Sequence, residues 1–154
     1  AGIVLEDGRA FVLVGPSGSG KTTWARLAKE AGALLVSDDM VFVDGAATGV
    51  EVLSAPIRGD RANPKGPGRW PLAGILFPVQ GETAELKDVG QLIAATRLLA
   101  NLPYLSDCPQ DDGRIDGLVQ HLLAAAPTYE LTFAERDAGF LDRLRSLKAP
   151  GNQP

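Results

Sequence analysis

The sequence predicts a mixed α/β fold, in which a sheet is flanked by helices. Apolar runs of strand length alternate along the chain with segments of helical periodicity, and one glycine-rich segment joins a strand directly to a helix. A length of 154 residues with 45% hydrophobic content allows one compact domain with a substantial core. We therefore assign residues 1–148 to a single domain and residues 149–154 to a C-terminal tail.

The first elements expected are a β-hairpin and a helix. Apolar residues 3–5 and 10–14 flank an Asp-Gly pair, and glycine accepts the positive φ of a tight turn. A helix follows over residues 21–31 and ends at Gly32, after which residues 34–36 predict a short buried strand. The strand that leads into the glycine-rich segment is thus the second arm of a hairpin.

A second hairpin and a long loop are expected next. Residues 40–45 and 50–53 are rich in β-favouring side chains, and we expect the turn between them at Asp44-Gly45. Residues 54–71 are rich in Gly, Pro and Arg, which predicts a loop. A loop of this length inside a small domain is usually either functional or mobile.

Strands and helices alternate in the second half of the chain. Residues 72–79 form an apolar run, in which Pro78 indicates the edge or the end of a strand. Asp88 and Gln91 form a capping-box-like pair, and the helix that follows has its apolar positions at Val89, Leu92, Ile93, Thr96 and Leu99. The last elements expected are a helix over 112–125, a strand over 128–133 and a helix over 138–147.

The glycine-rich segment matches the phosphate-binding loop pattern G-x-x-x-x-G-K-[ST]. It reads Gly15-Pro16-Ser17-Gly18-Ser19-Gly20-Lys21-Thr22, and Thr23 follows on the same predicted helix. Such a loop wraps a polyphosphate with backbone N–H groups, while its lysine reaches the outer phosphates and its threonine hydroxyl binds magnesium. The strand before the loop and the helix after it provide the required context. We therefore expect ATP and Mg²⁺ to bind at residues 15–23.

Two adjacent carboxylates, Asp38 and Asp39, follow the strand over residues 34–36. Ligands collect at the carboxyl edge of open α/β sheets, so these side chains are expected near the phosphate loop. One carboxylate suits magnesium, directly or through water, and the other suits a hydroxyl that attacks the γ-phosphoryl group. Lys21, Asp38 and Asp39 are accordingly the candidate catalytic residues.

Other side chains carry weaker signals. Arg58 and Arg61, together with Arg69, are candidates for contact with phosphates or acceptor, because a planar guanidinium matches a phosphoryl group. His121 is expected at the surface or its boundary rather than in catalysis. Packing is the expected role of the large aromatic side chains Trp24, Trp70, Tyr129 and Phe133.

Composition excludes several classes of protein. A net charge of −4 and a pI of about 4.9 disfavour nucleic acid as a partner. Cys108 is the single cysteine, so the chain forms no internal disulfide, which suits a reducing cytoplasm. No apolar run is long enough to cross a membrane, and the N-terminal residues lack the basic start of a secretion signal. Because the sequence begins at Ala1 rather than methionine, we treat upstream residues as an open question.

Assembled in this order, the pieces resemble the kinase domain of HPr kinase/phosphorylase and its relatives. The resemblance rests on the hairpin into residues 15–22, the helix after them, and Leu-Leu-Val-Ser-Asp-Asp-Met-Val-Phe-Val-Asp at residues 34–44. Residues 56–60, 72–77 and 127–133 match less specifically. That group is also similar to the nucleotide domain of ATP-dependent phosphoenolpyruvate carboxykinase, which implies a fold of that kind.

The resemblance implies roles for individual residues. Lys21 would contact phosphates, Thr22 and Asp39 would serve magnesium, and Asp38 would be the general base toward a serine of a protein or peptide. The resemblance also allows the two aspartates to exchange these roles. A homo-oligomer is also implied. HPr kinases carry a histidine shortly before the phosphate loop, and no histidine precedes Gly15 here. The chain therefore resembles a divergent relative that phosphorylates a precursor peptide or a free small molecule.

Three functions follow from these observations. The first is an ATP-dependent kinase that transfers the γ-phosphoryl group to a hydroxyl in HPr-kinase-like fashion. The second is a polynucleotide or small-metabolite kinase, although such enzymes usually enter a helix after the aspartates, whereas residues 40–45 predict a strand and a turn. The third is a non-catalytic nucleotide-binding module whose bound nucleotide orders a surface for a partner.

Overall fold

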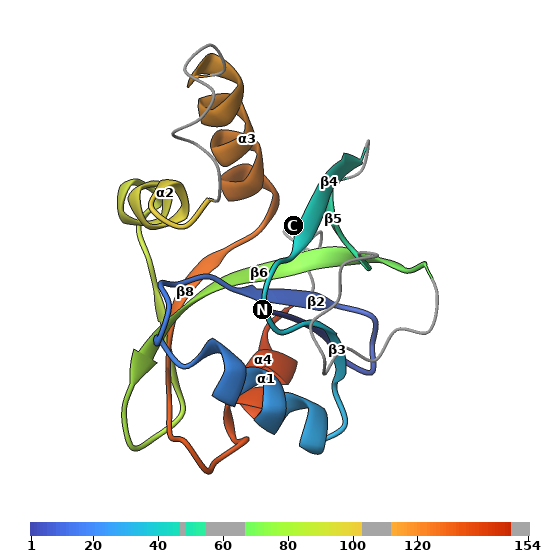
Figure 1. The fold of residues 1–154 in the computed structure, drawn as a ribbon, viewed down its shortest axis with the longest axis vertical. Helices are drawn as coiled ribbons and strands as arrows, with labels where there is room; N and C mark the ends of the chain where they lie inside the picture. The colour runs from blue at the N-terminus through green and yellow to red at the C-terminus, as the bar shows by residue number, and fades with distance from the viewer. Residues whose placement is uncertain (47–48, 55–66, 103–111, 149–154) are drawn as a thin grey trace.

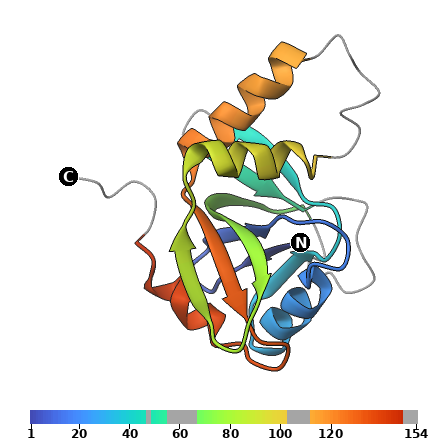
Figure 2. The ribbon, with the colours of Figure 1, turned by 90° about the vertical axis from the view of Figure 1, so that its left-hand side faces the viewer.

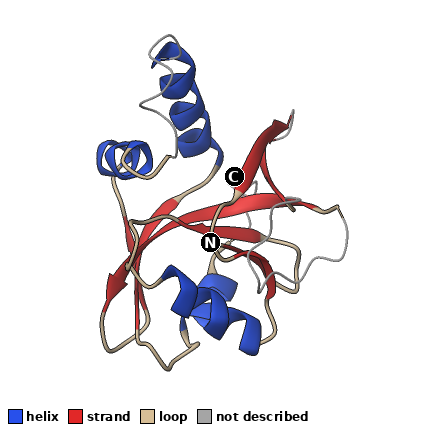
Figure 3. Ribbon diagram, viewed as in Figure 1, coloured by secondary structure: helices blue, strands red, loops and turns tan. Residues whose placement is uncertain are grey.

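A mixed sheet between two layers of helices forms the domain (Figure 1). The computed structural model describes residues 1–46, 49–54, 67–102 and 112–148. Helices α1 (Lys21–Glu30) and α4 (Phe140–Ser146) cover one face of the sheet, and α2 (Gln91–Leu99) and α3 (Asp112–Ala125) cover the other. Figure 2 shows the three layers from the side, and Figure 3 marks helices and strands separately. The predicted fold class, a mixed α/β sheet flanked by helices, is confirmed.

The order of the strands in the sheet places the carboxyl ends of two of them on the same side. Its strands are β1 (Gly2–Val4), β2 (Ala10–Leu13), β3 (Leu34–Ser37), β4 (Phe42–Ala46), β5 (Gly49–Leu53), β6 (Arg69–Gln80), β7 (Glu85–Asp88) and β8 (Thr128–Phe133). Their order is β3-β1-β2-β6-β5-β4, with β8 paired to β6 and β7 paired to β8. Since β1 is antiparallel to both of its neighbours, β2 and β3 run in the same direction. Their carboxyl ends therefore lie on the same side, one strand apart.

The N-terminal hairpin forms as predicted. Gly8 has a φ of 85°, and the backbone N–H of Leu5 donates to the carbonyl of Arg9 at 2.9 Å. The guanidinium of Arg9 is almost fully buried and donates to the carbonyls of Arg145 and Leu147 at the end of α4. Cations near a helix C-terminus satisfy its free carbonyls. The hairpin turn is thus joined to α4.

Each face of the sheet has its own apolar core. On the α1 face, the indole of Trp24 is completely buried and stacks on Phe140 with ring centroids 5.8 Å apart. Phe133 meets the same Phe140 ring edge-on. On the opposite face, Trp70 is half-buried against a core of mainly aliphatic side chains, which β5, β6, α2 and α3 help to form. The packing roles predicted for these aromatic residues are confirmed, and the phenol ring of Tyr129 is partly buried against the first core.

Two expectations in the middle of the chain were wrong. Asp44 and Gly45 do not form the turn of the second hairpin, because they pair with Glu51 and Val50 inside the β4–β5 ladder. The strand β6 begins at Arg69 rather than three residues later, because its first residues pair with β5. Pro78 does lie near the end of β6, beyond the stretch that pairs with β2.

The start of α2 also differs from the expectation. Asp88 is the last residue of β7, a strand that the sequence did not predict, and the residue that caps α2 is Gly90, with no side-chain hydrogen bond. The buried positions of α2 are Ala94 and Leu98, whereas Leu92 is 83% exposed. The helix begins only at Gln91, because Asp88 pairs with Tyr129 in the β7–β8 ladder.

The remaining expected elements are confirmed. The helix over 112–125, the strand over 128–133 and the helix within 138–147 are α3, β8 and α4. No helix in the described part of the chain has the length and apolar character that a membrane span needs. Cys108 and the predicted tail, 149–154, lie outside the described residues.

Candidate active site

The glycine-rich loop has the backbone shape of an anion-binding loop. Gly18 and Gly20 have φ of 79° and 94°, values that side chains rarely allow. A Cβ atom on Gly20 would also lie 3.2 Å from the ring of Phe133, and one on Gly15 would lie 2.7 Å from the hydroxyl of Ser19. The spacing of glycines in this loop is therefore required by the fold as well as by any ligand.

The loop ends at an open helix N-terminus. Gly20 is the N-cap of α1, no side chain caps the helix, and the first bond of the helix runs from the N–H of Trp24 to the carbonyl of Gly20 at 2.9 Å. The first N–H groups of a helix have no partner within the helix and carry its positive dipole end. In α1 these groups belong to Lys21, Thr22 and Thr23, so the segment is arranged to bind an anion.

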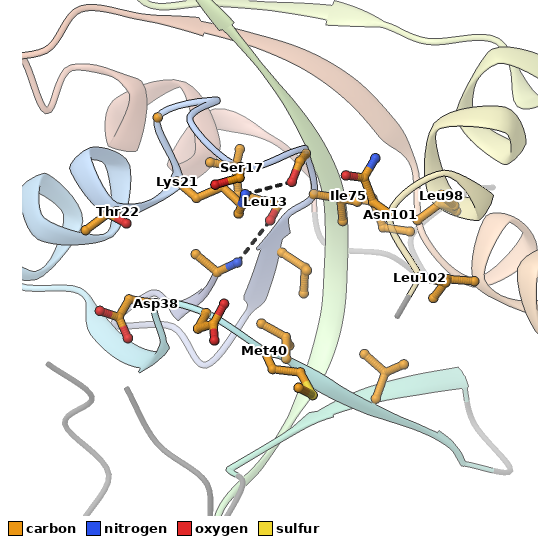
Figure 4. A pocket seen from close by; sticks show the side chains of 18 of the residues that line it. Leu13, Ser17, Lys21, Thr22, Asp38, Met40, Ile75, Leu98, Asn101 and Leu102 are labelled. Carbon is orange, nitrogen blue, oxygen red and sulfur yellow. Dashed lines mark hydrogen bonds between the residues drawn. The ribbon is translucent and has the colours of Figure 1, made fainter. Parts of the chain in front are cut away.

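Lys21 lies across the loop. Its ammonium group donates to the carbonyl of Gly15 at 2.7 Å (Figure 4). It also donates to the carbonyl of Pro16 at 2.7 Å. These two bonds hold the positive charge over the loop, beside the N-terminus of α1. A phosphate on the loop would therefore meet the lysine ammonium and the helix N–H groups together.

The aspartate pair lies at the carboxyl end of β3, as the sequence predicts. Asp39 is exposed, and its backbone N–H donates to the hydroxyl of Ser37 at 3.3 Å. The Oδ1 atom of Asp38 is buried and has no hydrogen-bond partner within the described residues. A buried acceptor without a partner costs free energy, which a bound hydroxyl or cation would recover.

The backbone nitrogen of Ala1 also lies beside these groups. It donates to the carbonyl of Leu13 at 3.0 Å, and Ala1 lines the same cavity as Lys21, Asp38 and Asp39. The phosphate loop and the aspartates therefore face one space.

One cavity of about 960 Å³ joins these groups. Its polar end is formed by the phosphate loop, the start of α1 and both aspartates, and its other end is apolar. In Figure 4, Lys21, Thr22 and Asp38 lie on one side, and Leu98, Asn101 and Leu102 lie on the other, with β6 between them. The apolar walls come from β4, β6, α2 and α3.

A second, smaller cavity of about 200 Å³ adjoins the loop. It lies at the carboxyl ends of β6 and β8, with Phe133 and Glu135 in its wall. Gly20 and Thr23 line both cavities. The N-terminus of α1 therefore lies between two spaces, one of which also contains the aspartates.

Most of the predicted site residues line the main cavity. These are Gly15, Ser17, Gly18, Gly20, Lys21, Thr22, Thr23, Asp38 and Asp39. Pro16 contributes the carbonyl that accepts from Lys21, and the hydroxyl of Ser19 is buried within the loop. The sequence thus identified the polar end of the cavity.

The candidate arginines do not contribute within the described residues. Arg58 and Arg61 lie outside that part of the chain. Arg69 lies on β6, where it bonds to Glu51 at 2.7 Å and to Asp44, so its role is to tie β6 to the β4–β5 hairpin. His121 is exposed on α3, opposite Gly45 of β4, as expected for a surface residue.

The apolar end of the cavity was not predicted. Its residues include Met40, Phe42 and Val43, which directly follow the aspartates, and Leu98 and Leu122 from the helices. The β-favouring run after Asp39 was a signal for the first group. No sequence pattern could identify the second group, since it depends on how α2 and α3 pack over the sheet.

Few side chains of the site could bind a metal ion. Among the described residues, no group of three or more His, Cys, Asp or Glu side chains is arranged to hold a metal ion. Magnesium bound with a nucleotide takes most of its ligands from phosphates and water, and needs only one or two protein oxygens. The hydroxyl of Thr22 and the carboxylates at the end of β3 fit this requirement.

Comparisons with known proteins agree with this site. A family model described as an AAA domain matches residues 11–104, which is more than half of the chain and includes the phosphate loop, the aspartate pair and α2. The match indicates a P-loop domain of the NTPase or kinase type. No curated protein and no solved structure matched the chain.

Proposed function

The chain belongs to the AAA domain family, and on this premise we propose that it is a kinase that transfers the γ-phosphoryl group of Mg-ATP to a hydroxyl. Family membership makes it a P-loop nucleotide-binding domain, either a phosphotransferase or an NTPase. The site supports the phosphotransferase. It offers a phosphate-binding end and, in the same cavity, a carboxylate and further space for a second substrate.

The observation that carries this proposal is the buried Oδ1 atom of Asp38. It lines the cavity that contains Lys21 and the start of α1, and it has no partner within the described residues. An acceptor hydroxyl would donate to this oxygen and be held beside the phosphates. Phosphoryl transfer requires mainly such positioning and the neutralisation of charge.

Each polar residue then has a role in the transfer. Lys21 and the N–H groups at the start of α1 bind the β- and γ-phosphates. The hydroxyl of Thr22 and the carboxylate of Asp39 are the proposed magnesium ligands, and the bound ion would neutralise charge on the phosphates. The acceptor oxygen attacks the γ-phosphorus, the bond to the bridging oxygen of ADP breaks, and the acceptor proton moves to Asp38.

The finer proposal is a serine acceptor in a protein or peptide. It rests on the resemblance of residues 15–44 to HPr kinases, and two features of the structure support it. The phosphate loop follows the second arm of a hairpin, and the chain continues after Asp39 into strand β4 rather than into a helix. The strand after Asp39 is the feature that separates the resemblance from polynucleotide and small-metabolite kinases, which usually enter a helix at this point.

A transfer assay with γ-labelled ATP tests the proposal. The protein and Mg²⁺ are incubated with serine peptides and with free alcohols, and label is counted in acceptor and in inorganic phosphate. The proposal predicts label in an acceptor, and a loss of roughly 10²–10⁴-fold in the Asp38→Asn variant. Tight binding of Mg-ATP without transfer or hydrolysis would instead indicate a regulatory module.

A further inference from the structure

The geometry points to an acceptor whose hydroxyl is carried beside a large apolar group. We propose that this group binds in the apolar end of the main cavity, between β4, β6 and the helices α2 and α3, while the hydroxyl reaches Asp38. The inference rests on the proposed kinase function and goes further by naming the chemical class of the acceptor.

The walls of this end are aliphatic and aromatic. Ile75, Leu98 and Leu122 are buried lining residues, each at most 5% exposed, and Val43 and Leu102 in the same wall are half-buried. Removing an apolar group from water against such side chains is favourable, roughly in proportion to the area buried. The space therefore suits an apolar group and offers little to a sugar or another highly hydroxylated molecule.

Charge is confined to the other end of the cavity. Among the described residues that line it, the charged side chains are Lys21, Asp38 and Asp39, all at the phosphate end. Asn101 is the polar side chain of the helical wall, and its amide nitrogen already donates to the carbonyl of Arg97 at 2.8 Å. An acceptor that carries a charge at its far end would consequently meet no opposite charge among these lining residues.

The nucleotide need not occupy the apolar end. Phosphates at the N-terminus of α1 would lie beside Gly20 and Thr23, which also line the smaller cavity at the ends of β6 and β8. A nucleoside extending into that space leaves the apolar end free. Asp38 lines the polar end of the cavity on the same side as Lys21 and Thr22 (Figure 4), and Met40 and Phe42, which follow it in the chain, continue the cavity wall toward the apolar end.

A panel of matched acceptors tests the inference. Short serine peptides flanked by leucine are compared with the same peptides flanked by aspartate, and phenylpropanol is compared with glycerol. We expect the apolar member of at least one pair to have a kcat/KM about tenfold or more above its polar partner. Preference within the peptide pair alone indicates a peptide serine, and preference within the alcohol pair alone indicates a free small molecule. Equal use of both members in both pairs would overturn the inference.

Two variants test whether the preference for apolar acceptors arises at the apolar end of the cavity, and a third variant is the matched control. Leu102→Gln places an amide in the apolar wall and should reduce the preference about tenfold, and Val43→Thr should reduce it less while keeping the shape of the strand. Leu92→Gln is the control, because Leu92 is exposed on α2 outside the cavity. A preference that persists in both cavity variants would contradict the assignment.

Binding measurements distinguish a failure of this inference from a failure of the proposed function. The leucine-flanked peptide and phenylpropanol are titrated into the wild-type protein with a non-hydrolysable Mg-ATP analogue. Binding that weakens in Leu102→Gln but not in Leu92→Gln supports the apolar site even if no acceptor is phosphorylated, which would refute the kinase alone. If neither probe binds, the apolar site is refuted whatever the kinase assay shows.

Discussion

The two ends of the cavity are built in opposite ways. The phosphate end comes from residues 15–23 and from the aspartate pair, short segments whose chemistry is fixed by backbone shape and charge. The apolar end comes from β4, β6, α2 and α3, which meet only after the sheet and both helices have packed. If the proposed function is right, nucleotide binding and acceptor choice are separable in this fold, and substitutions at one end of the cavity should spare the function of the other end.

Loss of Lys21 should impair both nucleotide binding and phosphoryl transfer at the phosphate end. Lys21→Ala removes the positive charge held over the loop by the carbonyls of Gly15 and Pro16. We expect phosphoryl transfer to fall by about 10²–10³-fold or more, as for the loss of a positioned charge donor, with weaker binding of Mg-ATP in calorimetry.

The control for this variant is Lys87→Ala on β7. Lys87 is exposed and lies outside the cavity. Equal losses in the two lysine variants would show that net charge, rather than the loop, determines nucleotide binding.

Asp38→Asn should separate phosphoryl transfer from nucleotide binding more sharply than any other substitution. The amide keeps the shape of the side chain but cannot take the acceptor proton, so transfer should fall by about 10²–10⁴-fold while the Kd of Mg-ATP changes little. Asp39→Asn should instead weaken the magnesium dependence of nucleotide binding. The assignment of roles is reversed if titrations of Mg²⁺ show the opposite pattern in the two variants.

Gly20→Ala should combine strain with loss of nucleotide binding. Its φ of 94° disfavours alanine by roughly 1–2 kcal/mol, and the new Cβ atom would lie 3.2 Å from the ring of Phe133. We expect a lower free energy of unfolding and a higher Kd for Mg-ATP.

Gly32→Ala is a matched control for backbone strain. Gly32 has a φ of 93°, but open space surrounds the position of its Cβ atom, and it follows the other end of α1. This variant should lose stability without losing nucleotide affinity. Equal effects of the two variants on the Kd would mean that the loop shape at Gly20 has no specific part in binding.

The smallest effect is expected far from both ends, at the hairpin turn. The hydrogen bond from Arg145 lowers the pKa of Glu6, so the ion pair stabilises the fold above the ordinary pKa of a glutamate and loses this contribution as the pH falls through the lowered value. Both side chains are exposed. Glu6→Gln should lower Tm slightly at neutral pH, but not in strong acid, and leave transfer unchanged.

Local patterns predicted the phosphate end well, because its information is local. The spacing of Gly15, Gly20 and Lys21 determines the loop, and the Asp-Gly pair before Arg9 determines the hairpin that leads into it. The position of Asp38 followed from a general property of sheets, that parallel strands present their carboxyl ends on one side. Even so, the sequence could not show that β1 lies between β2 and β3.

The apolar end could not be predicted because its causes are not local. Helical periodicity placed Leu92 and Ile93 on the buried face of α2, but packing on the sheet buries Ala94 and Leu98 instead. Strand β7 takes Asp88 into a ladder with β8, and this pairing overrides its expected role as a helix cap. Of these buried positions, Leu98 forms part of the apolar wall of the cavity.

The fate of the γ-phosphoryl group tests the central claim most directly. A single-turnover reaction of γ-labelled Mg-ATP with the wild-type protein and the apolar acceptors measures ADP, labelled acceptor and labelled inorganic phosphate together. We predict that labelled acceptor forms in equal amount to ADP, and that this product is lost in Asp38→Asn. Label released only as inorganic phosphate, at the same rate in both proteins, would contradict the account and identify the chain as an NTPase.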